Sequence, residues 1–139
     1  MTIFSRIIAG EIPCYKVAED ENFFAFLDIN PMSKGHTLVV PRKTENDYLF
    51  NLDDETYTGL TLFARKVAKA IEKSVDCKRI GVAVMGLEVP HTHIHLIPIN
   101  KEGDMNIGNP KLKLAPEEMA EIAEKIRNNF YCRWDSSNA

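Results

Sequence analysis

The stretch HTHIHLIPI, residues 91–99, constrains the fold of this chain more than any other segment. It sets histidines at positions 91, 93 and 95, and the whole chain holds only four. Successive side chains of a β-strand point to opposite faces, so a strand here places the three imidazoles on one face. Residues two apart on a strand lie about 6.5 to 7 Å from each other, close enough for imidazoles to share one small ligand. We therefore expect a strand over residues 91–99 with one functional face.

Three interpretations fit such a row of imidazoles. Neutral imidazoles bind zinc, and two of them together with His36 would supply three ligands and leave an open position. A phosphate site would use one imidazole as a nucleophile and its neighbours as donors. The histidines would otherwise be ordinary polar residues on a half-solvated sheet. The pattern alone leaves all three open.

Length, charge and cysteine usage narrow the class of protein. At 139 residues the chain predicts a single domain over 1–139, and a net charge of −3 argues against nucleic acid as a partner. No apolar run is long enough for a membrane span, so we expect no membrane partner. Cys14, Cys77 and Cys132 are odd in number and widely spaced, which fits reduced thiols. These features predict a cytoplasmic protein.

Hydrophobic periodicity and turn residues predict five strands and three helices. The expected strands cover residues 15–20, 23–29, 36–41, 82–84 and 91–99, and the expected helices cover 2–9, 52–75 and a segment beginning near Pro116. Asp53 or Asp54 is a suitable cap for the long helix. Its apolar stripe comprises Tyr57, Leu60, Ala64, Val67, Ala68 and Ile71. Short separations between strands predict an α+β fold with a five-stranded antiparallel sheet and helices packed on it.

Residues 101–139 are expected to form a C-terminal extension. Glycine, asparagine and charged residues dominate its first part, which predicts a loop. Pro116 suits the first turn of the helix that follows. The apolar face of that helix comprises Met119, Ile122, Ala123 and Ile126, and Trp134 is expected to pack behind it.

The histidine row, together with DINPMSKGHTLVVPRK and IFSRIIAGEIP upstream, resembles the histidine-triad family of nucleotide hydrolases and transferases. The resemblance covers residues 3–99 and is strongest to the purine-nucleoside phosphoramidase branch. It implies the histidine-triad fold and a homodimer whose sheets join across the interface. It also implies a purine nucleotide bound in a cleft against each triad, without a metal or another cofactor.

The resemblance implies a role for each histidine. His93 would attack the α-phosphorus of a purine nucleoside 5′-phosphoramidate or a related derivative and form a nucleotidyl-histidine that water hydrolyses. His91 and His95 would orient that ring and donate to the phosphate, and His36 would complete the cluster. An imidazole is a suitable nucleophile near neutral pH because its ordinary pKa of about 6.5 leaves much of it uncharged.

Asp28 and Ile29, from the motif FLDINP, are candidate substrate-binding residues. Asp28 matches the family's carboxylate that binds ribose hydroxyls, and Ile29 follows it directly. The same motif also suits an Asx turn, in which an aspartate accepts a backbone N–H two residues on. Both interpretations remain open at this point.

The segment VAVMGLEVPHTH departs from the family pattern. Relatives commonly carry an asparagine and a Gly-Gln pair there, whereas this chain has no asparagine and has Leu87 in place of the glutamine, followed by Glu88. We therefore expect backbone N–H groups to make phosphate contacts beside Leu87, and Glu88 to favour a cationic or amine leaving group. Thr2 and Ser5 replace the Cys-x-x-Cys that holds zinc in some bacterial relatives, so no such zinc is expected.

The leading hypothesis is a metal-independent nucleotide phosphoramidase. A dinucleoside polyphosphate hydrolase would use the same residues. A non-catalytic nucleotide-binding module would retain the cleft without turnover. A zinc enzyme is the fourth alternative.

Overall fold

Five antiparallel strands form one sheet in the order β1-β2-β3-β5-β4. The computed structural model describes residues 2–133, so the expectation for Trp134 lies outside the described residues. The strands are β1 (Lys16–Glu19), β2 (Phe23–Leu27), β3 (Thr37–Pro41), β4 (Arg79–Ala83) and β5 (Ile94–Ile99). This arrangement confirms the expected α+β class and the number of strands.

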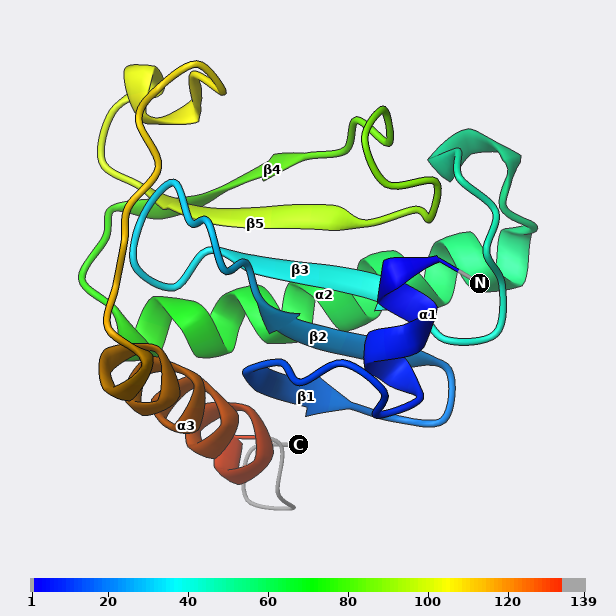
Figure 1. Ribbon diagram of the computed structural model, residues 1–139, viewed down its shortest axis with the longest axis horizontal. Helices are drawn as coiled ribbons and strands as arrows, with labels where there is room; N and C mark the ends of the chain where they lie inside the picture. The colour runs from blue at the N-terminus through cyan, green and yellow to red at the C-terminus, as the bar shows by residue number, and fades with distance from the viewer. Residues whose placement is uncertain (1, 134–139) are drawn as a thin grey trace.

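Helices cover both faces of the sheet (Figure 1). They are α1 (Ile3–Ile8), α2 (Asp54–Ser74) and α3 (Pro116–Arg133), with short 3-10 helices η1 (Leu49–Asn51) and η2 (Glu102–Met105). Asp53 rather than Asp54 is the cap of α2, because its side chain accepts the Thr56 N–H at 2.7 Å. None of the described helices is both long enough and apolar enough to cross a bilayer.

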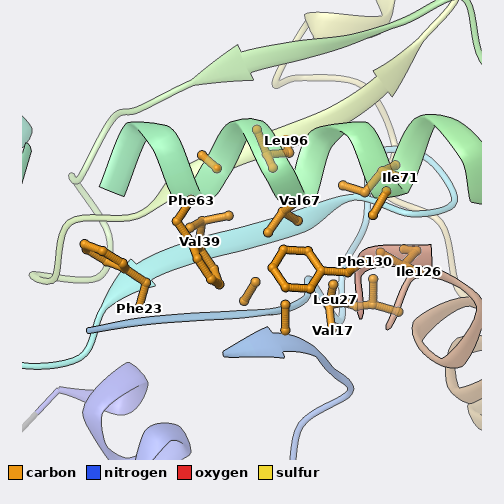
Figure 2. Packing of buried hydrophobic residues seen from close by; sticks show 14 of the residues in the cluster. Val17, Phe23, Leu27, Val39, Phe63, Val67, Ile71, Leu96, Ile126 and Phe130 are labelled. Carbon is orange, nitrogen blue, oxygen red and sulfur yellow. The ribbon is translucent and has the colours of Figure 1, made fainter. Parts of the chain in front are cut away.

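Alternating side chains divide the sheet into two apolar faces. The odd-numbered residues of β2 pack toward α2 and α3, whereas Phe24 and Phe26 pack on the opposite face. Figure 2 shows the larger cluster, in which α2 and α3 bury their apolar faces against the sheet. Its members include Val17, Phe23, Leu27, Val39, Phe63, Val67, Ile71, Leu96, Ile126 and Phe130. The second cluster comprises Phe4, Phe24, Phe26, Leu38 and Val40, so it lies under α1.

The strand expected over residues 91–99 begins only at Ile94, which corrects the sequence prediction. β3 pairs with β5 from Thr37 to Val39, and the ladder ends before Pro41, which has no N–H to offer. Thr92 instead donates both its N–H and its hydroxyl to the carbonyl of Asn46, at 2.9 and 2.7 Å. His91 and His93 therefore lie on the loop that enters the strand, and only His95 belongs to the strand itself.

The two edges of the sheet differ. At the β1 edge, side chains of α3 satisfy backbone groups: Arg127 donates to the carbonyl of Lys16 at 2.6 Å, and the Tyr131 hydroxyl accepts the N–H of Glu19 at 3.0 Å. At the other edge, β4 begins three residues earlier than expected and pairs only with β5 among the described strands. Val82 on β4 is 62% exposed. The open edge of the sheet is therefore β4.

Candidate active site

All four histidines gather where the loop before β5 meets the turn before β3. The ring centroids of His93 and His95 lie 4.9 Å apart, and those of His36 and His95 lie 5.2 Å apart. His36 and His91 are buried, and His93 is 7% exposed. The structure thus brings together the four imidazoles that the sequence singled out.

The turn before β3 fixes the position of His36. Gly35 adopts a φ of +95°, and a Cβ at this position would lie 3.2 Å from Val75, so glycine suits the turn on both counts. The His36 N–H donates to the carbonyl of Ser33 at 3.1 Å. The carbonyl of His36 accepts the N–H of Asp28 at 3.0 Å, which continues the pairing between β2 and β3.

A backbone N–H determines the protonation of His36 and, through it, of His95. The N–H of Met32 donates to Nδ1 of His36 at 3.0 Å, so the single ring proton of neutral His36 is on Nε2. That Nε2–H faces Nδ1 of His95 at 3.0 Å and donates to it. The proton of neutral His95 is therefore on its own Nε2, where it can be donated to a ligand.

A backbone carbonyl determines the protonation of His93. Nδ1 of His93 lies 2.7 Å from the carbonyl oxygen of His91, and a carbonyl can only accept, so Nδ1 carries the proton. Nε2 of neutral His93 therefore holds a lone pair. Among the described residues, no hydrogen bond to this Nε2 is present. His93 is thus the ring with a free lone pair, the property that a nucleophile requires.

Both ring nitrogens of His91 are engaged within the protein. Nε2 donates to the carbonyl of Pro41 at 3.0 Å, and Nδ1 lies 2.7 Å from the hydroxyl of Thr2. This geometry leaves His91 no ring nitrogen for a phosphate, in contrast to the donor role that the family resemblance implied. The carbonyl of His91 accepts the Nδ1–H of His93.

Burial keeps three of the rings neutral. It is the largest cause that lowers the pKa of His36 to about 3 and that of His95 to about 4. Neighbouring imidazoles lower both pKa values further. Burial also lowers the pKa of His91, against an opposing effect of its hydrogen bond to Pro41. The neutral forms agree with the proton positions that the backbone imposes.

Comparison with known proteins places this arrangement in a family. The HIT domain model matches residues 9–102. The chain belongs to the HIT family. The adenosine 5′-monophosphoramidase hnt1 of Schizosaccharomyces pombe is 37% identical over 130 residues, which cover 92% of this chain and 97% of that protein.

Two solved HIT structures share the architecture. A hypothetical histidine triad nucleotide-binding protein from Sulfolobus tokodaii superposes with a TM-score of 0.80 at 29% identity, covering 97% of this chain and 95% of that one. A Zn-bound histidine triad family protein from Mycobacterium smegmatis superposes with a TM-score of 0.75 at 27% identity, covering 94% and 93%. The likeness therefore extends through α3, beyond the segment that the domain model matches.

Asp28 forms the Asx turn that its HIT motif suits, and its second carboxylate oxygen lies near His36. Its Oδ1 accepts the N–H of Asn30 at 2.9 Å, which is the Asx turn, while Oδ2 lies 3.7 Å from Nε2 of His36. Burial raises the pKa of the Asp28 carboxyl, and the charge of Glu88 raises it further. The hydrogen bond from Asn30 lowers it. One carboxylate oxygen thus remains on the side of the histidines for a ligand.

The remaining substrate-binding candidates lie at the surface of the HIT fold. Ile29 is 69% exposed and Leu87 is 91% exposed, and Glu88 is also exposed. Among the described residues, no hydrogen bond or ion pair joins Ile29 or Leu87 to the histidines. Gly86, just before Leu87, adopts a φ of +71° and lies so close to the carbonyl of Asp47 that a Cβ would clash with it. The loop carrying Leu87 and Glu88 is therefore held against the segment before α2.

Two residues near the histidines escaped the sequence analysis. Phe4, the buried residue of α1, packs edge-on against His93 with ring centroids 4.9 Å apart. Lys111, from the extension, lowers the pKa of both Asp28 and His36 through its positive charge. The N–H of Leu112 anchors this segment to the carbonyl of Pro31 at 2.8 Å. The helical pattern of residues 2–9 was the only sequence feature that indicated a packing role for Phe4. No sequence feature indicated that Lys111 lies near the histidines.

Within residues 2–133, one group of side chains has the spacing of a metal site. Ligand atoms of Asp28, His36 and His95 lie within 4.8 Å of one another. To bind a metal through Nε2, His36 would have to move its proton to Nδ1, where the N–H of Met32 points. The hydrogen bonds therefore favour a proton rather than a metal ion between His36 and His95.

We expect the free energy of unfolding to fall as the pH decreases from about 6.5 toward the lowered pKa values of His36 and His95. In this window the unfolded chain binds protons that the folded chain does not, whereas above it both states are neutral. Urea unfolding between about pH 7.5 and about pH 4.5 measures the change. NMR titration checks the cause, and imidazole signals of His36 and His95 that titrate near pH 6.5 would contradict it.

Proposed function

We propose that this protein is a nucleotide hydrolase that cleaves a purine nucleoside 5′-phosphoramidate through a covalent nucleotidyl-histidine on His93. The observation that carries the proposal is the 2.7 Å hydrogen bond from Nδ1 of His93 to the carbonyl of His91. It fixes the ring and leaves the lone pair on Nε2 free for attack on phosphorus. The similarity to the Schizosaccharomyces pombe phosphoramidase, over nearly the full length of both chains, supports the same reaction class.

The proposed reaction has two displacements. In the first, Nε2 of His93 forms a bond to the α-phosphorus while the bond to the amine breaks, and the leaving nitrogen takes a proton from solvent. In the second, water attacks phosphorus, releases the nucleoside 5′-monophosphate and restores His93. His95 is suited to donate its Nε2–H to a phosphoryl oxygen, where charge increases in the transition state. Asp28 would bind the ribose hydroxyls.

We propose that the reaction needs no metal, because His93 supplies the nucleophile and His95 supplies a donor. We also propose that residues 1–139 form one histidine-triad domain, with 101–139 as an extension that contributes α3 to the core. Cys14 and Cys77 are free thiols, which fits a cytoplasmic protein.

A dinucleoside polyphosphate hydrolase is the second candidate function. The observation that favours it is Lys111, whose positive charge acts on Asp28 and His36 and would attract an anionic leaving group. A non-catalytic nucleotide-binding module would bind the same nucleotides and turn over none of them. The experiment below separates these candidates.

We expect the protein to cleave adenosine 5′-phosphoramidate at least about tenfold faster than diadenosine polyphosphates, with or without chelator. During turnover, mass spectrometry after an alkaline quench should find a nucleotide on His93, and an acid quench should remove it. His93→Asn should lose turnover and retain nucleotide binding, because only the attacking nitrogen is removed. Turnover by His93→Asn, or inactivation by chelator that zinc reverses, would contradict the mechanism.

Asp28→Ala should weaken binding of adenosine 5′-monophosphate by about tenfold or more and binding of the 2′,3′-dideoxy analogue by less than about twofold. The physical reason is that the carboxylate contacts hydroxyls present only in the ribonucleotide. Isothermal titration calorimetry on the same preparation measures both affinities. Ile29→Ala, at the next residue, is the control variant and should change both affinities equally. Equal losses for both nucleotides in Asp28→Ala would exclude the ribose contact.

We propose a homodimer in which the β4 edges of two copies pair, because β4 is the open edge of the sheet and carries the exposed Val82. Light scattering at micromolar concentration should therefore give twice the mass of one chain. Val82→Lys should give the mass of one chain, since the two-fold arrangement brings two added charges together. Leu62→Lys, on the exposed face of α2, is the control and should stay dimeric. A wild-type monomer would refute this assembly.

A further inference from the structure

The start of α1 contacts the histidine cluster, although it lies outside residues 9–102, which the HIT domain model matches. Thr2 is the N-cap of α1, because its hydroxyl oxygen accepts the N–H of Ser5 at 3.0 Å. The same oxygen lies 2.7 Å from Nδ1 of His91, which is 89 residues away in the sequence. A capping residue therefore has a second contact inside the candidate active site.

The direction of this second hydrogen bond follows from the surroundings of His91. Nε2 of His91 faces the carbonyl of Pro41, which only accepts, so the ring proton is on Nε2 and Nδ1 is an acceptor. The Thr2 hydroxyl must then donate its proton to Nδ1. His91 is fully buried, so a missing donor would leave Nδ1 unsatisfied in a site that water does not reach.

Two neighbours leave the Thr2 proton available for this role. The hydroxyl of Ser5 donates to the carboxylate of Glu45, and its oxygen lies 3.1 Å from the Thr2 hydroxyl, whereas Nδ1 of His91 is the closer acceptor at 2.7 Å. Glu45 also accepts the N–H of Thr2 at 2.9 Å and ties the start of α1 to the segment after β3. The oxygen of Thr2 is thus oriented by the Ser5 N–H, and its proton points toward His91.

We propose that Thr2 is a positioning residue for the reaction. Its hydroxyl holds His91 in the Nε2–H form and in one orientation, and the carbonyl of His91 in turn holds Nδ1 of His93. Two hydrogen bonds connect Thr2 to the nucleophile. The Thr2 hydroxyl donates to Nδ1 of His91 at 2.7 Å, and Nδ1 of His93 donates to the His91 carbonyl at 2.7 Å. This inference rests on the proposed function, since it presumes that His93 attacks phosphorus.

Phe4 strengthens the connection between α1 and the same two rings. Its ring packs edge-on against His91 and His93, with centroids 5.8 and 4.9 Å apart. The charged and titratable groups that face His91 are Glu45 and His93; burial is the largest cause that lowers the pKa of His91, His93 lowers it further, and Glu45 raises it. A neutral His91 is the form that needs a donor at Nδ1.

Three substitutions of Thr2 separate donation from capping. Thr2→Ser retains both. Thr2→Asp retains the cap, because aspartate is as good an N-cap as threonine, but it offers only acceptors to Nδ1. Thr2→Val removes the donor and the cap at nearly constant shape. Arg6→Gly is the control, because it weakens α1 at an exposed position without touching His91.

Two measurements on each variant separate catalysis from binding. They are the rate of nucleotide transfer to His93 in a single turnover and the affinity for adenosine 5′-monophosphate. We expect Thr2→Val and Thr2→Asp to slow transfer by about tenfold or more while affinity changes by less than about threefold. Thr2→Ser and Arg6→Gly should stay within about threefold of the wild-type rate. Wild-type rates in Thr2→Val, or an equal loss in Arg6→Gly, would overturn the positioning role.

Imidazole nitrogen chemical shifts supply a readout that does not depend on activity. The wild type should show His91 protonated on Nε2 alone, Thr2→Ser should match it, and Thr2→Asp should show a proton on Nδ1. An unchanged His91 spectrum in Thr2→Asp would overturn the inference. A wild type that binds nucleotide but neither forms an adduct nor turns over would instead refute the proposed function, and the spectra would still decide whether Thr2 donates to His91.

Discussion

A neutral imidazole carries one ring proton, and the backbone groups around the site accept or donate in only one sense. This constraint orders the whole histidine cluster. The N–H of Met32 forces the proton of His36 onto Nε2, and the carbonyl of His91 forces the proton of His93 onto Nδ1. Backbone groups do not titrate, so these assignments hold at every pH at which the rings are neutral. The positions of the ring protons on His36 and His93 therefore depend on the path of the main chain.

The two faces of the sheet carry different apolar clusters. On one face α2 and α3 bury a continuous apolar cluster. On the other, Phe4, Phe24, Phe26, Leu38 and Val40 form a smaller cluster under α1, and the histidines border it. The large core holds the strands in place, and the small one keeps water away from rings that must stay neutral.

Much of this architecture was predictable because it depends on local pattern. The alternation of β2, the apolar stripe of α2 and the proline at the start of α3 are all visible within a few residues. The loop at His91 to His93 was not predictable, because it depends on Thr92 turning toward Asn46 instead of pairing with β3.

The site was predictable to the same extent. The motifs indicated the four histidines and Asp28 as site residues. The positions of the ring protons depend on contacts between residues far apart in the sequence. The sequence indicated Thr2 only as a replacement for a zinc-binding cysteine, because its hydrogen bond to His91 joins residues 89 positions apart. The charge of Lys111 acts on Asp28 and His36 because the N–H of Leu112 binds the carbonyl of Pro31, a contact without a sequence signature, while its ammonium group donates to carbonyls of its own loop.

The closed edge at β1 has a consequence for the size of any assembly. Arg127 and Tyr131 of α3 occupy backbone groups of β1, so in the proposed homodimer a neighbouring sheet would add along β4. A unit that can be extended at one end alone forms pairs, whereas a unit open at both ends forms fibres of unlimited length. In the proposed homodimer the C-terminal helix would thereby prevent further strands from adding to the joined sheet.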